Sequence, residues 1–321
     1  MDNSTGINIL DKKLSYQTQL KLDSLYHHNA RSRQSPQLII FIIDMSEQMQ
    51  TPYREHKTKM KYSSHLIQTI LKEIFTGYHI DICKDCFISL LGYSRGMNEE
   101  PDIIKSDWIQ DWEYEICANG LDSLLTSEQG KVSCSTKGAF LSITDMCKEW
   151  IKTYPPINKY NKEGYLYECG SPTPIIIHIT SGDKMDFNMF EEEIKGIHSI
   201  RTVDGMPLLF NILLKNDEEN EIFCPEHYKS NVDSNQNLFE VSSFCPHSFC
   251  ETMERYGANR PSEKIGRLFC VNPYETDKIK ELVRCMTQHY DFMFGMYMNP
   301  YVGDVQRVGE YDYSQFPYVV E

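Results

Sequence analysis

The stretch that decides the fold is Leu38-Ile39-Ile40-Phe41-Ile42-Ile43-Asp44, six apolar residues followed by a carboxylate. A run that is apolar at every position predicts a strand buried on both faces, because a half-exposed strand would alternate polar and apolar residues. Such strands are typical of parallel sheets with helices on each side. Asp44 is then at the carboxyl end of the strand, where open α/β sheets bind their ligands.

Beyond this run, strand-like segments alternate with segments of helical periodicity. The alternation predicts βαβ units, and therefore an α/β protein with a Rossmann-like, central, mostly parallel sheet flanked by helices. Strands are predicted over residues 86–93, 113–117, 174–180, 207–214 and 238–241, and helices over residues 57–75, 137–153, 187–197, 249–256 and 277–290.

The chain of 321 residues divides into three parts. Residues 1–36 are a polar extension and linker, in which Leu10, Leu14, Leu22 and Leu25 are spaced for one short amphipathic helix. Residues 37–290 form the main domain. Residues 291–321 are a Tyr-rich tail without clear periodicity, either a recognition segment or an arm packed against its own domain.

Composition and charge narrow the classes of function. The net charge is −14 without a dense basic run, so we expect binding neither to nucleic acid nor to anionic membranes. The longest wholly apolar run has six residues, whereas a membrane span needs about 20. The first residues lack the pattern of a secretory signal, and eleven cysteines in mostly apolar surroundings indicate reduced thiols. These features predict a cytoplasmic protein.

Hydroxyl and carboxylate side chains gather where the predicted strands end. The first strand is followed by Asp44-Met45-Ser46-Glu47-Gln48, and the strand over residues 174–180 by Ser181-Gly182-Asp183. A serine-containing loop, Ser133-Cys134-Ser135, precedes a predicted helix. Parallel strands end at one edge of a sheet, so we expect these segments to line a common cleft.

This layout resembles the von Willebrand factor A (vWA) domain, whose strands end in D-x-S-x-S and T-D-G and which has a Thr loop before a middle helix. It is most similar to bacterial vWA proteins of the tellurium-resistance-associated type, on three segments: Leu209-Phe210-Asn211, Phe223-Cys224-Pro225 and Leu238-Phe239-Glu240-Val241-Ser242-Ser243-Phe244-Cys245-Pro246. The resemblance covers residues 37–290. It implies a vWA fold with a metal-ion-dependent adhesion site, in which carboxylates and hydroxyls hold Mg²⁺.

The sequence departs from the family pattern at the implied metal site. Gln48 replaces the second Ser, and Ser181 replaces the Asp of T-D-G. Cys134 falls where the loop Thr is expected, or Ser133 or Ser135 takes that place if the loop differs by one residue. The resemblance therefore implies a degenerate site, in which Asp44 and Ser46 bind Mg²⁺ weakly or not at all, and no other cofactor. The predicted partner-binding residues are Asp44, Ser46, Gln48, Ser135, Ser181 and Asp183.

We expect a non-catalytic protein-binding module rather than an enzyme, since G-x-S-x-G, P-loop, G-x-G-x-x-G and H-E-x-x-H motifs are absent from the sequence. The resemblance implies a bacterial stress or defence assembly, with a protein kinase or phosphatase as a partner. The alternative is a metalloenzyme or thiol-redox protein. Its candidate cluster is Cys224, His227, Cys245, His247 and Cys250, whose spacing does not match a standard zinc finger.

Two other motifs have structural interpretations. Cys83 and Cys86 form a C-x-x-C, but Cys86 opens an apolar strand rather than a helix, which favours packing over redox chemistry. His178 lies within the apolar run over residues 174–180. We expect it to be a hydrogen-bonded core histidine.

Overall fold

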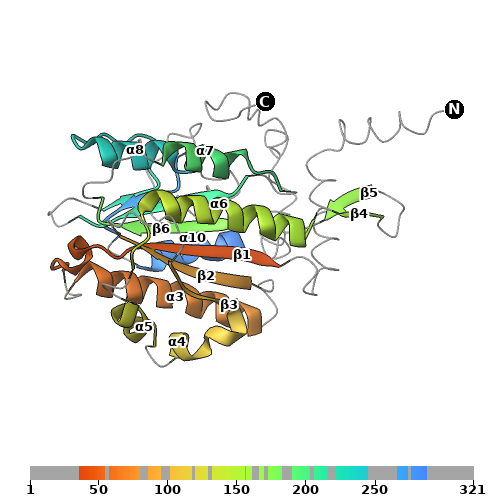
Figure 1. Cartoon of the computed structure of the whole chain (residues 1–321), viewed down its shortest axis with the longest axis horizontal. Helices are drawn as coiled ribbons and strands as arrows, with labels where there is room; N and C mark the ends of the chain where they lie inside the picture. The colour runs from red at the N-terminus through yellow and green to blue at the C-terminus, as the bar shows by residue number, and fades with distance from the viewer. Residues whose placement is uncertain are drawn as a thin grey trace, which may run out of the picture.

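The computed structural model describes fourteen stretches of the chain. Within them the chain forms a seven-stranded sheet, a separate two-stranded sheet and helices on both faces of the larger sheet (Figure 1). The described residues are 36–54, 58–79, 86–94, 102–117, 120–128, 132–155, 157–160, 166–169, 173–182, 190–202, 206–215, 221–244, 266–273 and 276–287.

The large sheet has the strand order β3-β2-β1-β6-β7-β9-β8. Neighbouring strands from β2 to β9 pair in parallel, and the edge strands β3 and β8 pair antiparallel. The chain first adds β2 and β3 on one side of β1 and later adds β6 and β7 on the other. The switch point of the topology therefore lies between β1 and β6. The strands are β1 (Gln37–Asp44), β2 (Cys86–Tyr93), β3 (Asp102–Trp108), β6 (Ile175–Thr180), β7 (Leu208–Leu213), β8 (Ile222–Phe223) and β9 (Phe269–Val271).

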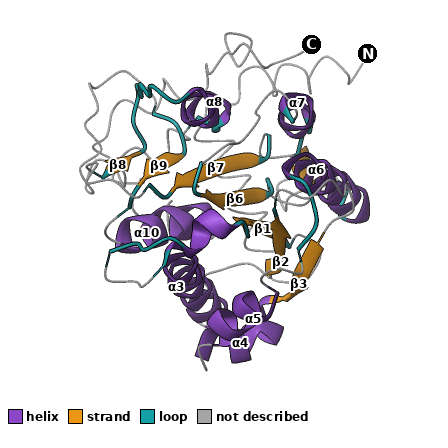
Figure 2. Ribbon diagram, turned by 60° about the vertical axis from the view of Figure 1, so that its left-hand side comes forward, coloured by secondary structure: helices purple, strands orange, loops and turns teal. Residues whose placement is uncertain are grey.

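Helices cover both faces of this sheet, as Figure 2 shows. One face carries α3 (Lys59–His79), α4 (Glu113–Cys117), α5 (Gly120–Glu128) and α10 (Thr276–Thr287), with the short 3-10 helices η1 (Glu47–Gln50) and η2 (Ile109–Trp112) in the connecting segments. The other face carries α6 (Thr136–Thr153), α7 (Glu191–Ser199) and α8 (Asp233–Val241).

Strand β1 is the centre of both cores. Ile39, Phe41 and Ile43 pack on the side of α3 and α10, whereas Ile40 and Ile42 pack on the side of α6 and α7. All five side chains are fully buried. The alternation of successive side chains between the two faces explains why every position of the strand is apolar. The predicted α/β class, with a Rossmann-like, mostly parallel sheet flanked by helices, is confirmed.

Two predicted strands are wrong. Residues 113–117 form α4, which is held by the main-chain oxygens of Glu115 and Ile116 accepting hydrogen bonds from Gln68 of α3. The third strand on this side is instead β3, whose polar, half-exposed residues suit an edge and gave no apolar signal. Residues 238–241 belong to α8, because a short apolar run does not distinguish strand from helix.

Several predicted segments lie outside the described residues, among them the extension before residue 36, the helix over 249–256 and the Tyr-rich tail. An unpredicted antiparallel pair, β4 (Ile157–Tyr160) with β5 (Leu166–Cys169), forms the small second sheet. Among the described helices, none has the length and apolar content of a membrane span.

Candidate functional site

The side chain of Asp44 lies where the central strand β1 ends, in the middle of the edge formed by the C-terminal ends of the parallel strands. It lies at the switch point between β1 and β6 and is 5% exposed. Its Oδ1 accepts a hydrogen bond from the Ser46 amide at 2.9 Å. Its Oδ2 accepts from the Ser181 hydroxyl at 2.9 Å, and from the Ser181 amide and the Thr180 hydroxyl at 3.3 Å each. Asp44 therefore joins the ends of two strands that are 137 positions apart in the sequence.

The turn after β6 is built on Gly182. Its φ of +72° is in the left-handed region, which glycine adopts without steric cost, and its amide donates to the Thr180 hydroxyl at 3.0 Å. The Gly182 carbonyl accepts from the Ser234 hydroxyl of α8 at 3.0 Å. A Cβ atom on Gly182 would lie 2.5 Å from Asn235 Oδ1. The first turn of α8 thus packs directly against the turn that holds Ser181 beside Asp44.

A buried chain of polar side chains links the strands next to the Asp44 cluster. The Tyr93 hydroxyl lies 2.7 Å from His178 Nε2, and His178 Nδ1 lies 2.7 Å from Asn211 Oδ1. Asn211 Nδ2 donates to the Ser242 hydroxyl and to the Leu238 carbonyl, which places the amide oxygen of Asn211 toward His178. Nδ1 of His178 must therefore carry the proton, and Nε2 accepts from Tyr93. The chain links β2, β6, β7 and α8.

Burial sets the protonation states in this chain. It lowers the pKa of His178 to about 4, although the hydrogen bond to Asn211 and the charge of Asp44 act in the opposite direction. Burial also raises the pKa of the Tyr93 hydroxyl, and the charge of Asp44 raises it further. At neutral pH both groups are uncharged. His178 is the hydrogen-bonded core histidine that the sequence predicts.

The loop before α6 is held from the side of β2 and β3. The amides of Ser133 and Cys134 both donate to Asp102 Oδ2 at 2.7 Å, and the Ser94 amide donates to the Cys134 carbonyl at 2.8 Å. Ser135 caps α6, its hydroxyl accepting from the Gly138 amide at 3.0 Å. The Ser135 side chain thus already has a structural role.

The structure brings three of the six predicted site residues, Asp44, Ser46 and Ser181, into one hydrogen-bonded cluster. Gln48 is half-buried in η1, Ser135 caps α6, and Asp183 lies outside the described residues. The sequence analysis missed Tyr93, Asn211 and Asn235. Tyr93 and Asn211 each end or interrupt an apolar run, a signal that a buried polar group is present.

The residues around Asp44 do not fit a hard cation as they are arranged. An ionised carboxylate has about two acceptor positions on each oxygen. Three donors of the chain point at Oδ2 of Asp44 and one at Oδ1, so Oδ2 is fully used and one position of Oδ1 is left. Ser181 donates its hydroxyl proton to Asp44 and supplies no second negative charge. Within the described ranges, no group of three or more His, Cys, Asp or Glu side chains gathers.

The described part of the Cys/His cluster does not converge on one point. Cys224 is buried in the hydrophobic core beside β8, with φ of +45°. His227 is 76% exposed and pairs with Glu226. Cys245, His247 and Cys250 lie outside the described residues. Cys86 of the C-x-x-C motif is buried in the same core, and Cys83 is also outside.

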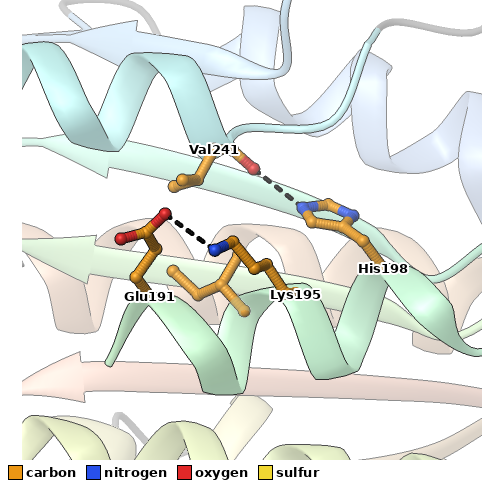
Figure 3. A pocket seen from close by; sticks show the side chains of 5 residues that line it. Glu191, Lys195, His198 and Val241 are labelled. Carbon is orange, nitrogen blue, oxygen red and sulfur yellow. Dashed lines mark hydrogen bonds and ion pairs between the residues drawn. The ribbon is translucent and has the colours of Figure 1, made fainter. Parts of the chain in front are cut away.

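A shallow surface depression without room for a water molecule lies between α7 and the end of α8 (Figure 3). Its polar groups are paired within the chain: Lys195 Nζ lies 3.0 Å from Glu191 Oε1, and His198 Nε2 lies 3.0 Å from the Val241 carbonyl. Burial lowers the pKa of His198. The contact of His198 with Val241 joins α7 to α8, whereas the pair of Lys195 with Glu191 lies within α7. Neither contact resembles a catalytic arrangement.

Among the comparisons with known proteins, only the comparison with solved structures gives matches. No protein-family model matches the chain, and no curated protein matches it. Solved structures that match include a von Willebrand factor type A protein from Catenulispora acidiphila, with 10% identity, a TM-score of 0.34, and 78% of this chain and 41% of that one covered.

Two further matches are the conserved hypothetical protein BatB from Bacteroides thetaiotaomicron and the pilus adhesin SpaC from Lactobacillus rhamnosus GG. BatB has 8% identity and a TM-score of 0.31, with 56% of this chain and 66% of that one covered. SpaC has 10% identity and a TM-score of 0.42, and the match covers 81% of this chain and 31% of SpaC. The chain thus spans less than two thirds of each of these three proteins. With TM-scores this low, the matches carry no argument about function, and the fold class rests on the sheet topology itself.

Proposed function

We propose that this chain is a non-catalytic, cytoplasmic protein-binding module of the vWA type, which uses the carboxyl edge of its sheet around Asp44, Ser46 and Ser181. The observation that carries the proposal is the position of the Asp44 cluster. It occupies the topological switch point between β1 and β6, where open α/β sheets bind their ligands. The family resemblance of the strand-end motifs supports the same surface.

The chemistry of the buried reactive groups supports a non-catalytic function. Both ring nitrogens of His178 are hydrogen bonded, and its side chain is 0% exposed. Burial raises the pKa of the Cys147 thiol to about 12, so this thiol stays protonated at neutral pH. Neither group is available to act on a substrate.

The biological setting is proposed from resemblance. The similarity to tellurium-resistance-associated vWA proteins favours a bacterial stress or defence assembly, and a protein kinase or phosphatase of the same system as the partner.

The test of the module is capture of partners from native extract by the full chain, by Asp44→Ala and by Glu149→Ala. Glu149 is an exposed acid on α6, away from the Asp44 cluster, so its replacement is a matched control. We expect Asp44→Ala alone to lose the captured protein, with all three chains folded by circular dichroism. Capture that survives Asp44→Ala contradicts the proposed surface.

We further propose that Mg²⁺ binds only in the millimolar range or not at all, because the Asp44 oxygens already accept four hydrogen bonds. Calorimetric titration of the purified chain measures this, and a micromolar constant would disprove it. Metal analysis of the same sample addresses the metalloenzyme alternative. Zinc at about one ion per chain would favour that alternative over a binding module.

A further inference from the structure

Strand β3 is the outermost strand of the large sheet on the side of β2 (Figure 2). Its seven residues pair with β2 along one side, and within the described part of the chain no strand pairs with the other side. The outward main-chain amide and carbonyl groups of β3 are therefore open to a further strand. Such an edge is either protected against pairing or used for it.

The protection of this edge is incomplete. A lysine on an edge strand ordinarily keeps other strands away, but Lys105 is turned back onto its own chain. Its Nζ donates to the Asp111 carbonyl at 2.9 Å and to Glu115 Oε2 at 2.8 Å. A bulge leaves Ile104 opposite no residue of β2, so it disturbs only the first half of the strand. Residues 105–108 remain regular and able to pair.

The charges on β3 are complementary to those of a second copy of the chain. Lys105 and Asp107 are two positions apart, so their side chains lie on the same face of the strand. Residues directly opposite each other in an antiparallel pair also lie on one face. A two-fold axis between two copies of β3 must therefore place one residue opposite its own copy.

One position of the axis matches the charges. With Lys105 at the axis two ammonium groups are opposite each other, and with Asp107 two carboxylates, which is unfavourable. With Ser106 at the axis, Lys105 of each copy is opposite Asp107 of the other. Nζ of Lys105 has one of its three donor positions left after its contacts with Asp111 and Glu115. Among the described residues, the Asp107 carboxylate accepts only from the next main-chain amide, at 2.9 Å.

We propose that two copies of this chain associate through β3, antiparallel, with Ser106 at the two-fold axis and two ion pairs between Lys105 and Asp107. Because β3 is antiparallel to β2, the parallel strands of the second copy then run opposite to those of the first. The two Asp44 clusters lie at opposite edges of one continuous sheet. The pairing goes beyond the proposed function and does not depend on it, whereas that function makes the pair bivalent.

The first experiment is sedimentation velocity of the full chain from about 1 µM to about 300 µM. One short strand buries little area, so we expect a dissociation constant on the order of 100 µM. Hydrogen exchange at both ends of this range locates the contact. The amides of residues 104–108 should exchange more slowly at the high concentration, where the second strand covers them.

The second experiment changes the charges. Asp107→Lys places ammonium groups opposite each other, and Lys105→Glu places carboxylates opposite each other. Each variant alone should dimerise about ten-fold more weakly or worse. An equimolar mixture should associate about as well as the unmodified chain, because each basic pair of one variant then meets the acidic pair of the other. Melting temperatures are measured first, and Lys105→Gln replaces Lys105→Glu in the mixture if the latter does not fold, with one ion pair regained.

The matched control is Asp145→Lys, the same change of charge at an exposed position of α6, and it should dimerise like the unmodified chain. A chain that stays monomeric at about 300 µM overturns the proposal. Dimerisation that Asp107→Lys leaves unchanged, an equal loss in Asp145→Lys, or a mixture that does not associate also overturns it. None of these outcomes touches the proposed function, which stands or falls with partner capture by Asp44→Ala.

Discussion

The contact of Ser181 with Asp44 depends on the backbone conformation of one residue, Gly182. With φ of +72°, any other residue would be strained, and a Cβ atom would lie 2.4 Å from Leu213 Cδ1 and 2.5 Å from Asn235 Oδ1. Leu213 is fully buried, so it has little room to move. This turn positions Ser181 against Asp44.

We therefore predict that Gly182→Ala destabilises the protein by about 2 kcal/mol or more, from strain and overpacking together. The matched control is Gly196→Ala on α7, whose Cβ atom would meet Thr144 at an ordinary 3.5 Å. It should be neutral or stabilise by about 0.5–1 kcal/mol, because alanine is the better helix former. Urea unfolding of the two variants measures both effects. Equal losses would contradict the geometry of the turn.

A second prediction at this scale concerns the metal site that the family resemblance implies. The double variant Gln48→Ser, Ser181→Asp restores the family pattern but removes the hydroxyl donor from Asp44 Oδ2 and adds a second carboxylate beside it. Two neighbouring carboxylates repel each other unless a cation lies between them. We expect a lower melting temperature without Mg²⁺, its recovery with Mg²⁺, and no gain in native partner binding. A melting temperature that does not respond to Mg²⁺ would count against this reading of Ser181.

At the scale of elements, the buried chain from Tyr93 through His178 to Asn211 ties three strands to α8. Its hydrogen bonds require neutral His178, because a protonated Nε2 has no lone pair to accept from Tyr93. The same chain ends on α8, the helix that holds Gly182 through Ser234. Protonation of one histidine would thus disturb the contacts between β2, β6, β7 and α8.

The direction of the pH dependence follows from the lowered pKa. His178 titrates at 6.5 when unfolded and at about 4 when folded, so its contribution is complete above pH 6.5 and is lost as pH falls toward 4. The loss amounts to roughly 3 kcal/mol by pH 4. We predict that His178→Gln flattens the fall of unfolding free energy over this range.

The comparison variant is His198→Gln, since burial lowers the pKa of His198 as well. Each single variant should remove part of the slope and the double variant most of it. Unfolding in urea at several pH values between 7 and 4 gives these slopes. A slope unchanged in His178→Gln would mean that other groups cause the acid sensitivity.

At the scale of the whole molecule, the two large hydrophobic cores close within residues 36–287. One lies between the sheet and α3 with α10, and the other between the sheet and α6 with α7 (Figure 2). Both are built on β1, which begins at Gln37. The predicted domain of residues 37–290 contains all of these elements.

We therefore predict that a fragment of residues 36–290 folds and melts at the same temperature as the full chain. Differential scanning calorimetry of both chains measures this. A melting temperature several degrees lower would indicate that residues before 36 or the Tyr-rich tail pack against the domain, the second of the two readings of that tail. Partner capture by the fragment then shows whether the tail takes part in recognition.

The sequence by itself determined the central elements and part of the site. The six apolar residues before Asp44 predict burial on both faces, and the periodicity over residues 137–153 predicts α6, because local burial patterns repeat with the period of the element. The family motifs also bring Asp44, Ser46 and Ser181 to one edge, which the structure confirms as a hydrogen-bonded cluster.

The remaining elements and contacts depend on how the chain packs. The half-exposed edge strand β3 has a weak apolar pattern, and pairing with β2 makes it a strand. The residues of α4 alternate between polar and apolar as in a strand, but this segment forms a helix that packs against α3. The pairing of Tyr93 with His178 spans 85 positions, and the approach of Asn235 to Gly182 joins a helix to a distant turn. Hydrogen bonds between residues so far apart leave no periodic trace in the sequence, because their partners are set by the order of the strands in the sheet.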